Sequence, residues 1–227
     1  MRVDREKYYG VITGDIVGSA RYTGSKRQRL NKAMKLAGDR LLESFPDSLT
    51  IPVDIFRGDS WQCIIEKPEQ CLRIGLSYRA GVKAILNDNK ADSRVAVGIG
   101  RIEFLPENRV SEGDGEAFRI SGRLIENLPQ GSRMGFAISG KENRKDAEAI
   151  SVIVSLIDAI AGGWTAKQCL AVAGALRGYS QARIADVWHP NPISQQSVAQ
   201  HLNRSNWNVI GKALEFVKST IKLHLRI

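Results

Sequence analysis

The sequence contains few cysteines, and they are not spaced for any shared chemistry. The three are Cys63, Cys71 and Cys169. An odd number of widely separated cysteines fits neither a disulfide framework nor a zinc site, because both need paired or clustered thiols. We therefore expect three reduced thiols, the usual state of cysteine in the cytoplasm.

Long apolar runs are also absent. The most apolar stretch, residues 147–161, is interrupted by Glu148 and Asp158 and closed by Gly162, so it is too short to cross a bilayer. Residues 1–7 are charged and lead into a strand pattern without the apolar block of a signal peptide. Neither an internal repeat nor a low-complexity tract is present. These absences predict a cytoplasmic protein with no membrane partner.

What remains is the composition of an ordinary folded chain with an excess of basic residues. Of 227 residues, 43% are hydrophobic and 25% are charged, which is typical of globular proteins that bury one large core or two modest ones. The formal net charge is +9 and the pI is near 9.6. Such a charge points to a polyanionic partner only where it coincides with a binding motif.

The spacing of apolar residues divides the first part of the chain into alternating strands and helices. Strand patterns cover 8–16, 51–56, 61–66 and 94–104, and helical patterns fill the intervals after the first and third strands. Gly58-Asp59, between the second and third strands, is a hairpin signal. The order strand, helix, strand, strand, helix, strand predicts an α+β fold of the ferredoxin-like βαββαβ type, which also forms the palm of polymerases and cyclases.

Two carboxylates stand out by their positions. Asp15 ends the first strand, just before a turn at Gly18, and Asp59 lies at the tip of the hairpin. We expect the first strand and the first strand of the hairpin to be neighbours, which would bring these ends together. Close carboxylates repel unless a divalent cation holds both ionised, so the pair predicts a Mg²⁺ or Mn²⁺ site for nucleotide phosphates. The alternative is structural: Asp15 caps a turn and Asp59 is an ordinary hairpin residue.

The motifs around these residues resemble those of two families. The segments GDIVGS (14–19), RGDS (57–60), RVAVGIG (94–100) and GEAFRISGRL (115–124) are similar to successive motifs of class III nucleotidyl cyclases. The same string is still more similar to the SatD-like family of small bacterial proteins, which also end in a helix-turn-helix. The resemblance runs from Val11 to about Trp207. It implies a nucleotidyl cyclase-like domain that binds or converts a nucleotide.

The resemblance implies roles position by position. Asp15 and Asp59 match the metal-binding aspartates of the cyclases, and Arg123 matches the residue that stabilises charge developing on the phosphates. Arg119 stands where the cyclases have asparagine, and Ile55 stands where many have a purine-selecting lysine. We take Arg119 and Arg123 together as candidate catalytic residues, since arginines at i and i+4 share a helix face and a triphosphate between them would satisfy both.

The same resemblance implies nucleotide-binding roles for five residues. Four lie near the aspartates: Gly18, Ser19, Arg57 and Gly58. The fifth, Glu112, replaces the acidic residue with which the cyclases recognise the base. The metal and phosphate groups are thus present, while the base pocket is altered. Catalysis in the cyclases needs a homodimer, because the aspartates and the arginine act from opposite subunits. A plain mixed-charge surface, with Glu116 and Glu126 near the two arginines, explains that helix equally well.

After Gly163 the chain changes to short helices rich in Ala and Gln. Thr165 caps a helix over 166–176, and a second helix covers 180–188. A turn rich in proline leads to a third helix that starts at Ser194 and covers 195–207. A last helix, 206–223, has one apolar side for the bundle or for a second subunit.

The third of these helices carries the side chains of a DNA reader. The segments YSQARIADVW and ISQQSVAQHL resemble the sigma-factor-type helix-turn-helix, whose recognition helix enters the major groove. Its polar face presents groups that hydrogen-bond to bases and phosphates. The candidate DNA-binding residues are Gln195, Gln196, Ser197, Gln200, His201 and Arg204. A small helical bundle used only for dimerisation is the alternative.

These observations predict three regions and three ranked functions. A nucleotidyl cyclase-like domain covers 1–145, a connecting helix covers 146–163, and a helix-turn-helix domain covers 164–227. The leading hypothesis is a homodimeric transcription regulator that senses a nucleotide or related phosphorylated ligand and binds DNA. The second is a metal-dependent nucleotidyl cyclase or nucleotidyltransferase with an accessory helix-turn-helix. A scaffold with an inactive cyclase domain is a third.

Overall fold

The first strand is the centre of a mixed sheet. The computed structural model describes residues 3–107, 109–140 and 144–227. The strands are β1 (Tyr8–Ile16), β2 (Asp54–Phe56), β3 (Ser60–Ile65), β4 (Ser93–Phe104), β5 (Asp114–Gly115) and β6 (Met134–Ile138). They lie in the order β2-β3-β1-β4-β5, and β6 pairs with β4 in parallel. Strand β1 is antiparallel to both of its neighbours, β3 and β4.

The prediction that the first strand of the hairpin lies beside β1 was wrong. Strand β3, the second strand of the hairpin, pairs with β1, and β2 lies outside it. The burial of the two strands explains this order. Trp61 and the four residues after it are all buried, whereas the residues of β2 are only half-buried. The inner place in the sheet therefore goes to the strand that is buried on both faces.

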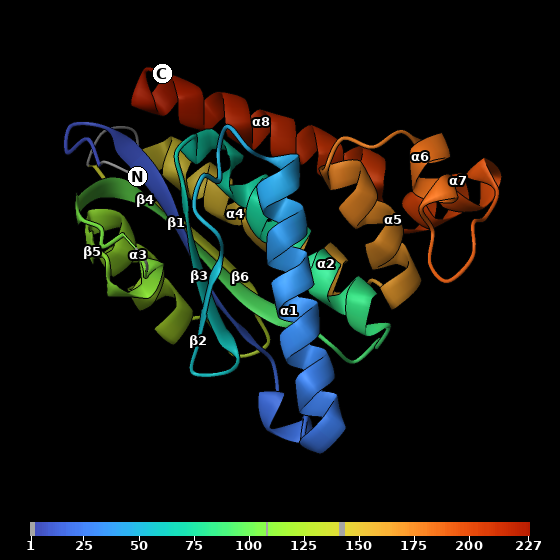
Figure 1. The fold of residues 1–227 in the computed structure, drawn as a ribbon. Coiled ribbons are helices and arrows are strands. Elements are labelled where there is room, and N and C mark those ends of the chain that lie inside the picture. The colour runs from blue at the N-terminus through green and yellow to red at the C-terminus, as the bar shows by residue number, and fades with distance from the viewer. Residues whose placement is uncertain (1–2, 108, 141–143) are drawn as a thin grey trace.

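Helices cover both faces of the sheet, which confirms the α+β class. Helices α1 (Gly24–Ser44) and α2 (Cys71–Leu86) lie on one face, and α3 (Glu116–Glu126) lies on the other (Figure 1). Alternate residues of β1 serve the two faces. Ile12 and Ile16 join the core with α1 and α2, while Tyr9 and Val11 join Phe118 of α3.

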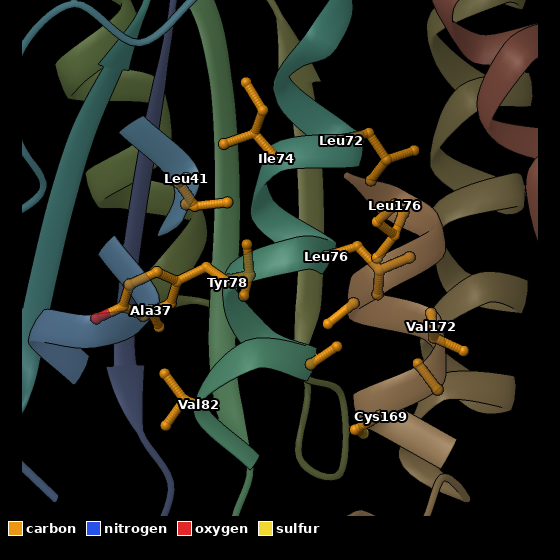
Figure 2. Close-up of a cluster of buried hydrophobic side chains, with 14 of the residues drawn as sticks. Ala37, Leu41, Leu72, Ile74, Leu76, Tyr78, Val82, Cys169, Val172 and Leu176 are labelled. Carbon is orange, nitrogen blue, oxygen red and sulfur yellow. The ribbon is translucent and has the colours of Figure 1, made fainter. Parts of the chain in front are cut away.

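Helix α2 is buried along nearly its whole surface, and it joins the two halves of the chain. Tyr78 faces Ala37 and Leu41 of α1, while Leu72 and Leu76 face α5 (Ala166–Leu176) (Figure 2). Such all-round burial is typical of a helix at the centre of a fold. One continuous core therefore contains residues from β1 to the last helix. The division at 145 and 164 stays a prediction.

The remaining helices extend this core. Helix α4 (Arg144–Gly162) packs against β6, and α8 (Trp207–Leu225) packs against α4 and α2. Helices α6 (Gln181–Asp186) and α7 (Gln195–Arg204) lie with α5 at the end of the molecule away from α3 (Figure 1). Residues 141–143, just before the predicted domain boundary at 145, lie outside the described part of the chain. Within the described ranges, no helix is long and apolar enough to span a membrane.

A buried ion network fixes α4 to the sheet. Arg79 of α2 donates to Asp158 of α4 at 2.6 Å and to both oxygens of Asp92 at 2.7 and 2.9 Å. The second oxygen of Asp158 accepts the backbone N–H groups of Arg133 and Met134. Burial lowers the pKa of Arg79, but hydrogen bonds and charge from both carboxylates outweigh it and raise that pKa above its ordinary value. Asp158, which interrupts the apolar pattern of α4, is thus held by hydrogen bonds to Arg79 and to the backbone at the start of β6.

Candidate functional site

Asp15 lies between β3 and β4 and is held by an arginine. Its partners in the sheet are Ser60 and Arg94. The Arg94 guanidinium donates from Nε to Asp15 Oδ1 at 2.8 Å and from Nη2 to Oδ2, and its Nη1 donates to the carbonyl of Ile125 in α3. The hydrogen bond to Asp15 is the main cause of a raised pKa of Arg94, with burial acting in the opposite direction. Both oxygens of Asp15 are therefore engaged.

Asp59 lies at the same end of the sheet but makes different contacts. Because Asp15 pairs with Ser60, Asp59 is next to it along the neighbouring strand. Ser19 donates its hydroxyl to Asp59 Oδ2, and the Asp59 carbonyl accepts the N–H of Ile16 at 3.1 Å. The structure thus brings together the turn after β1 and the tip of the hairpin.

The backbone of both loops has the left-handed geometry that suits glycine. Gly18 has φ of 61° and Gly58 has φ of 80°, where a side chain would be strained. A Cβ on Gly58 would also lie 2.5 Å from Nη2 of Arg27 in α1, so the hairpin tip packs closely on that guanidinium. Arg57, with φ of 51°, is exposed at the tip. Four of the five predicted nucleotide-binding residues therefore lie in these two adjacent loops.

The side chains of the two aspartates leave the sheet in different directions. Thr13 Oγ1 is 2.9 Å from Ser121 Oγ in α3, and Asp15, two residues later, faces the same side of the sheet. Gln62 of β3 also donates to Thr13 at 2.7 Å. Asp59 instead contacts Ser19, in the turn that leads to α1. The predicted pair is close in register, but the structure records no contact between the two carboxylates.

The described residues do not form a ready metal site. They contain no group of three or more His, Cys, Asp or Glu side chains placed to hold an ion. Mg²⁺ needs several oxygen ligands in octahedral geometry, and both oxygens of Asp15 already accept N–H groups from Arg94. A metal at Asp15 would first have to displace that guanidinium. The donor set therefore does not fit the predicted cation as it stands.

The two arginines of α3 do not share a partner. Arg119 donates to Glu103 at 2.6 Å and to Asp114 at 2.9 Å, and the bond to Glu103 is the main cause of its raised pKa. Arg123 is exposed and donates from Nε to the carbonyl of Arg119. Arg123 precedes by two residues the carbonyl that binds Arg94, so it lies toward the Asp15 end of α3. Arg119 is engaged elsewhere.

The Glu112 side chain also pairs with a residue away from the two aspartates. It belongs to a 3₁₀ turn, Val110–Glu112, that follows β4, and it pairs with Arg109 at 3.0 Å. Both side chains are more than half exposed. Within the described part of the chain, no hydrogen bond or ion pair joins the Glu112 side chain to the loops around Asp15 and Asp59. The base-reading role proposed for it stays a prediction.

The predicted reading helix exposes most of its candidate residues. Ser194 caps α7 by accepting the N–H of Ser197 at 3.1 Å, and Val198 and Leu202 are buried on the inner side. On the outer side, the exposed candidates are Gln196, Gln200 and Arg204, and Gln195 is exposed at the first position of the helix. Ser197 is half-buried, and its hydroxyl lies 2.9 Å from that of Ser194. Two amides and the guanidinium are thus accessible from one side of α7.

His201 differs from the other candidates. Its ring stacks on Trp188, with centroids 5.2 Å apart and an interplanar angle of 18°. Burial, followed by the positive charges of Lys167 and Arg204, lowers the pKa of His201 from its ordinary value. Its neutral form is therefore favoured at neutral pH, and it serves the packing between α7 and the loop after α6.

Sequence reasoning missed the partner of Asp15. In the sequence, the segment RVAVGIG served only as a family motif, while in the structure its Arg94 guanidinium donates to both oxygens of Asp15. The one available signal was that Arg94 opens the strand antiparallel to the end of β1, which places it opposite Asp15. Thr13, Gln62 and Ser121, the polar contact between the sheet and α3, were missed as well.

Comparisons with known proteins give little further guidance. No family model matches the chain, and a search of curated proteins finds no match. Among solved structures, the chain is similar to the crystal structure of the guanylyl cyclase Cya2, with 13% identity and a TM-score of 0.42. That alignment covers 61% of this chain and 77% of the other. A likeness at this level does not identify an activity.

Proposed function

We propose that this protein is a homodimeric DNA-binding transcription regulator in which α7 reads the major groove. Its front half is proposed to have a ferredoxin-like, cyclase-type fold and to sense a nucleotide or related phosphorylated ligand. Membership of the SatD-like family and a helix-turn-helix formed by α6 and α7 belong to the same proposal. One observation carries it: α7 exposes Gln196, Gln200 and Arg204 on the side opposite buried Val198 and Leu202.

The chemistry of that helix face suits DNA. Glutamine can bind adenine and arginine can bind guanine, each through two hydrogen bonds in the major groove. Helix α7 contains no Asp or Glu that would repel phosphates, and Lys167 lies close enough to lower the pKa of His201. The net charge of +9 adds favourable long-range attraction.

The test is binding to a duplex selected from a random-sequence pool. In fluorescence anisotropy at fixed salt, the double variant Q196A/Q200A should lose affinity for the selected duplex. Each lost pair of base contacts is worth about 1–3 kcal/mol, while affinity for a scrambled duplex should hardly change. Q28A is the matched control, since Gln28 is an exposed glutamine on α1. Equal affinity of wild type and Q196A/Q200A for the selected duplex would overturn the assignment of α7.

The homodimer is supported by an apolar stripe on α8, defined as Val209, Phe216 and Leu223. These residues are 51–77% exposed and lie seven positions apart, so they follow one line of the helix. The adjacent helix α4 also exposes Val152 and Leu156. Exposed apolar patches mark interfaces, and DNA-reading helices commonly act in two-fold pairs. A second copy of the chain is the proposed occupant.

A metal-dependent nucleotidyl cyclase or nucleotidyltransferase is the second candidate. It is favoured by the register that places Asp59 beside the end of β1, next to Asp15. It requires Mg²⁺ or Mn²⁺ to replace Arg94 at Asp15. The test is product analysis by mass spectrometry after incubation with each nucleoside triphosphate and Mn²⁺. A cyclic or linked product that is lost in D15A/D59A would place the enzyme first.

A further inference from the structure

A basic cavity lies between the start of α1 and the loop after α2. Its volume is about 550 Å³, within the range of small-molecule sites. Arg21, Lys26 and Arg29 line it on the α1 side, and Lys90 lines it from the loop between α2 and β4. Tyr22 and Asn87 add an aromatic ring and an amide. Neither Asp15 nor Asp59 lines this cavity.

The cavity has more positive charge than its own acid can balance. Asp88 is its one carboxylate, and it already accepts the Tyr22 hydroxyl at 3.2 Å and the backbone N–H of Lys90 at 2.9 Å. Arg21 lies 4.0 Å from the same carboxylate. Within the described ranges, Lys26, Arg29 and Lys90 have no carboxylate partner within ion-pair distance. Their three charges remain uncompensated.

We propose that this cavity binds the phosphate chain of a small di- or triphosphate ligand, without a divalent metal. Four cations supply the charge that Mg²⁺ would otherwise provide to such a ligand: Arg21 from the turn before α1, Lys26 and Arg29 from α1, and Lys90 from the loop after α2. The exposed amide of Asn87 offers a contact for a base or ribose. The inference rests on the proposed function, in that it gives the sensed ligand a site different from the Asp15 and Asp59 loops.

The position of the cavity links it to the predicted reading helix. Asn87 and Asn89 also line a second cavity of about 340 Å³, whose other side includes Lys167, His201 and Arg204. Asn89 Oδ1 accepts the N–H of Ala166 at 2.8 Å, which ties the loop to the first turn of α5. A ligand at Lys90 therefore lies against the loop that α5 contacts and that shares a cavity with α7.

The concave shape favours a small ligand over the backbone of DNA. The cations surround one cavity, whereas phosphate-tracking residues would follow an extended line. Binding of inorganic triphosphate is the direct test, measured by isothermal titration calorimetry with EDTA present. We expect the wild type to bind and K26A/K90A to lose more than about tenfold in affinity. K32A/K35A removes the same charge from exposed α1 positions outside the cavity and should change little.

Each other result would overturn the assignment. Absence of binding to the wild type, or equal losses in K26A/K90A and K32A/K35A, would show no site or only diffuse surface charge. Binding that requires Mg²⁺ and disappears in D15N/D59N would place the ligand at the sheet end. A loss of DNA affinity by K26A/K90A without triphosphate, equal to that of R204A, would assign these lysines to DNA.

Two further measurements are needed. One distinguishes a nucleotide from polyphosphate as the ligand, and the other distinguishes failure of this cavity from failure of DNA binding by α7. Competition by nucleoside triphosphates at lower concentrations than inorganic triphosphate would assign the site to nucleotides, and the reverse order to polyphosphate itself. Both results support a phosphate site. Q196A/Q200A should bind triphosphate normally, so failure of DNA binding by α7 and failure of this cavity are distinguishable.

Discussion

Arg94 holds both carboxylate oxygens of Asp15 at the end of the central strands. The arginine balances a charge that a divalent cation balances in the expected metal site. Its guanidinium also reaches the carbonyl of Ile125, so it joins the sheet to the end of α3. The availability of Asp15 to any ligand therefore depends on whether Arg94 moves.

The first prediction concerns Mn²⁺ binding, followed by electron paramagnetic resonance of the free ion. Because Asp15 is already paired, D15N should leave the Mn²⁺ affinity of the wild type unchanged. R94Q should raise that affinity severalfold, and the gain should disappear in R94Q/D15N. R101Q is the matched control, since Arg101 lies on the same strand and pairs with exposed Glu6. A wild-type Mn²⁺ site that D15N abolishes would contradict this account.

The second prediction concerns the buried network around Arg79. D158A should lower the free energy of unfolding by about 3–5 kcal/mol, because it leaves a buried guanidinium short of one partner. It also leaves the N–H groups of Arg133 and Met134 without their acceptor. Urea unfolding measures the change, and E148A on the exposed side of α4 is the control. A loss below about 1 kcal/mol, typical of an exposed pair, would mean that the network is not structural.

The third prediction concerns the pH dependence contributed by His201. Its pKa is lowered in the folded state from an ordinary value of 6.5, chiefly by burial. The unfolded chain therefore binds a proton more readily, and stability falls as the pH drops through 6.5 toward the folded pKa. Thermal unfolding of wild type and H201Q one pH unit above and below 6.5 should give a smaller decrease for the variant. Equal decreases would show that His201 makes no contribution.

The fourth prediction concerns the dimer. The wild type should have twice the 25.0 kDa mass of the chain in light scattering, and F216E/L223E should have the mass of the monomer. Burying two charges in an apolar interface without partners opposes association. The variant should also bind the selected duplex more weakly, because one half-site is lost. F104E introduces a charge at an exposed position on β4 and should remain dimeric. A monomeric wild type would contradict both the dimer and the cyclase alternative.

The sequence predicted local structure better than the relations between distant segments. The bounds 8–16 for a strand and 166–176 for a helix agree with the structure, since alternation and the cap at Thr165 are local signals. The helix expected to reach 207 ends at 204, because Asn206 takes a left-handed conformation with φ of 57°. Periodicity does not indicate which strand takes the inner place, and so the pairing of β3 with β1 was missed.

The candidate site shows the same division. Glycines at 18 and 58 were identified from turn chemistry, and their positive φ values agree with it. The partners that decide charge come from far along the chain: Arg94 is 79 residues from Asp15, and Glu103 is 16 from Arg119. The basic cavity combines α1 with a loop about 60 residues later, and no sequence motif joins them. Such sites depend on the packing of α1 against α2.

The last prediction joins the two proposed sites. A bound triphosphate places several negative charges against the loop that also borders Lys167 and Arg204. We expect that charge to reduce the attraction of α7 for DNA phosphates, an effect that is screened over about 8 Å at physiological salt. We expect inorganic triphosphate to weaken binding of the selected duplex by about fivefold or more in anisotropy titrations. K26A/K90A should abolish this effect and K32A/K35A should retain it, and an equal effect on K26A/K90A would mean competition at the DNA surface itself.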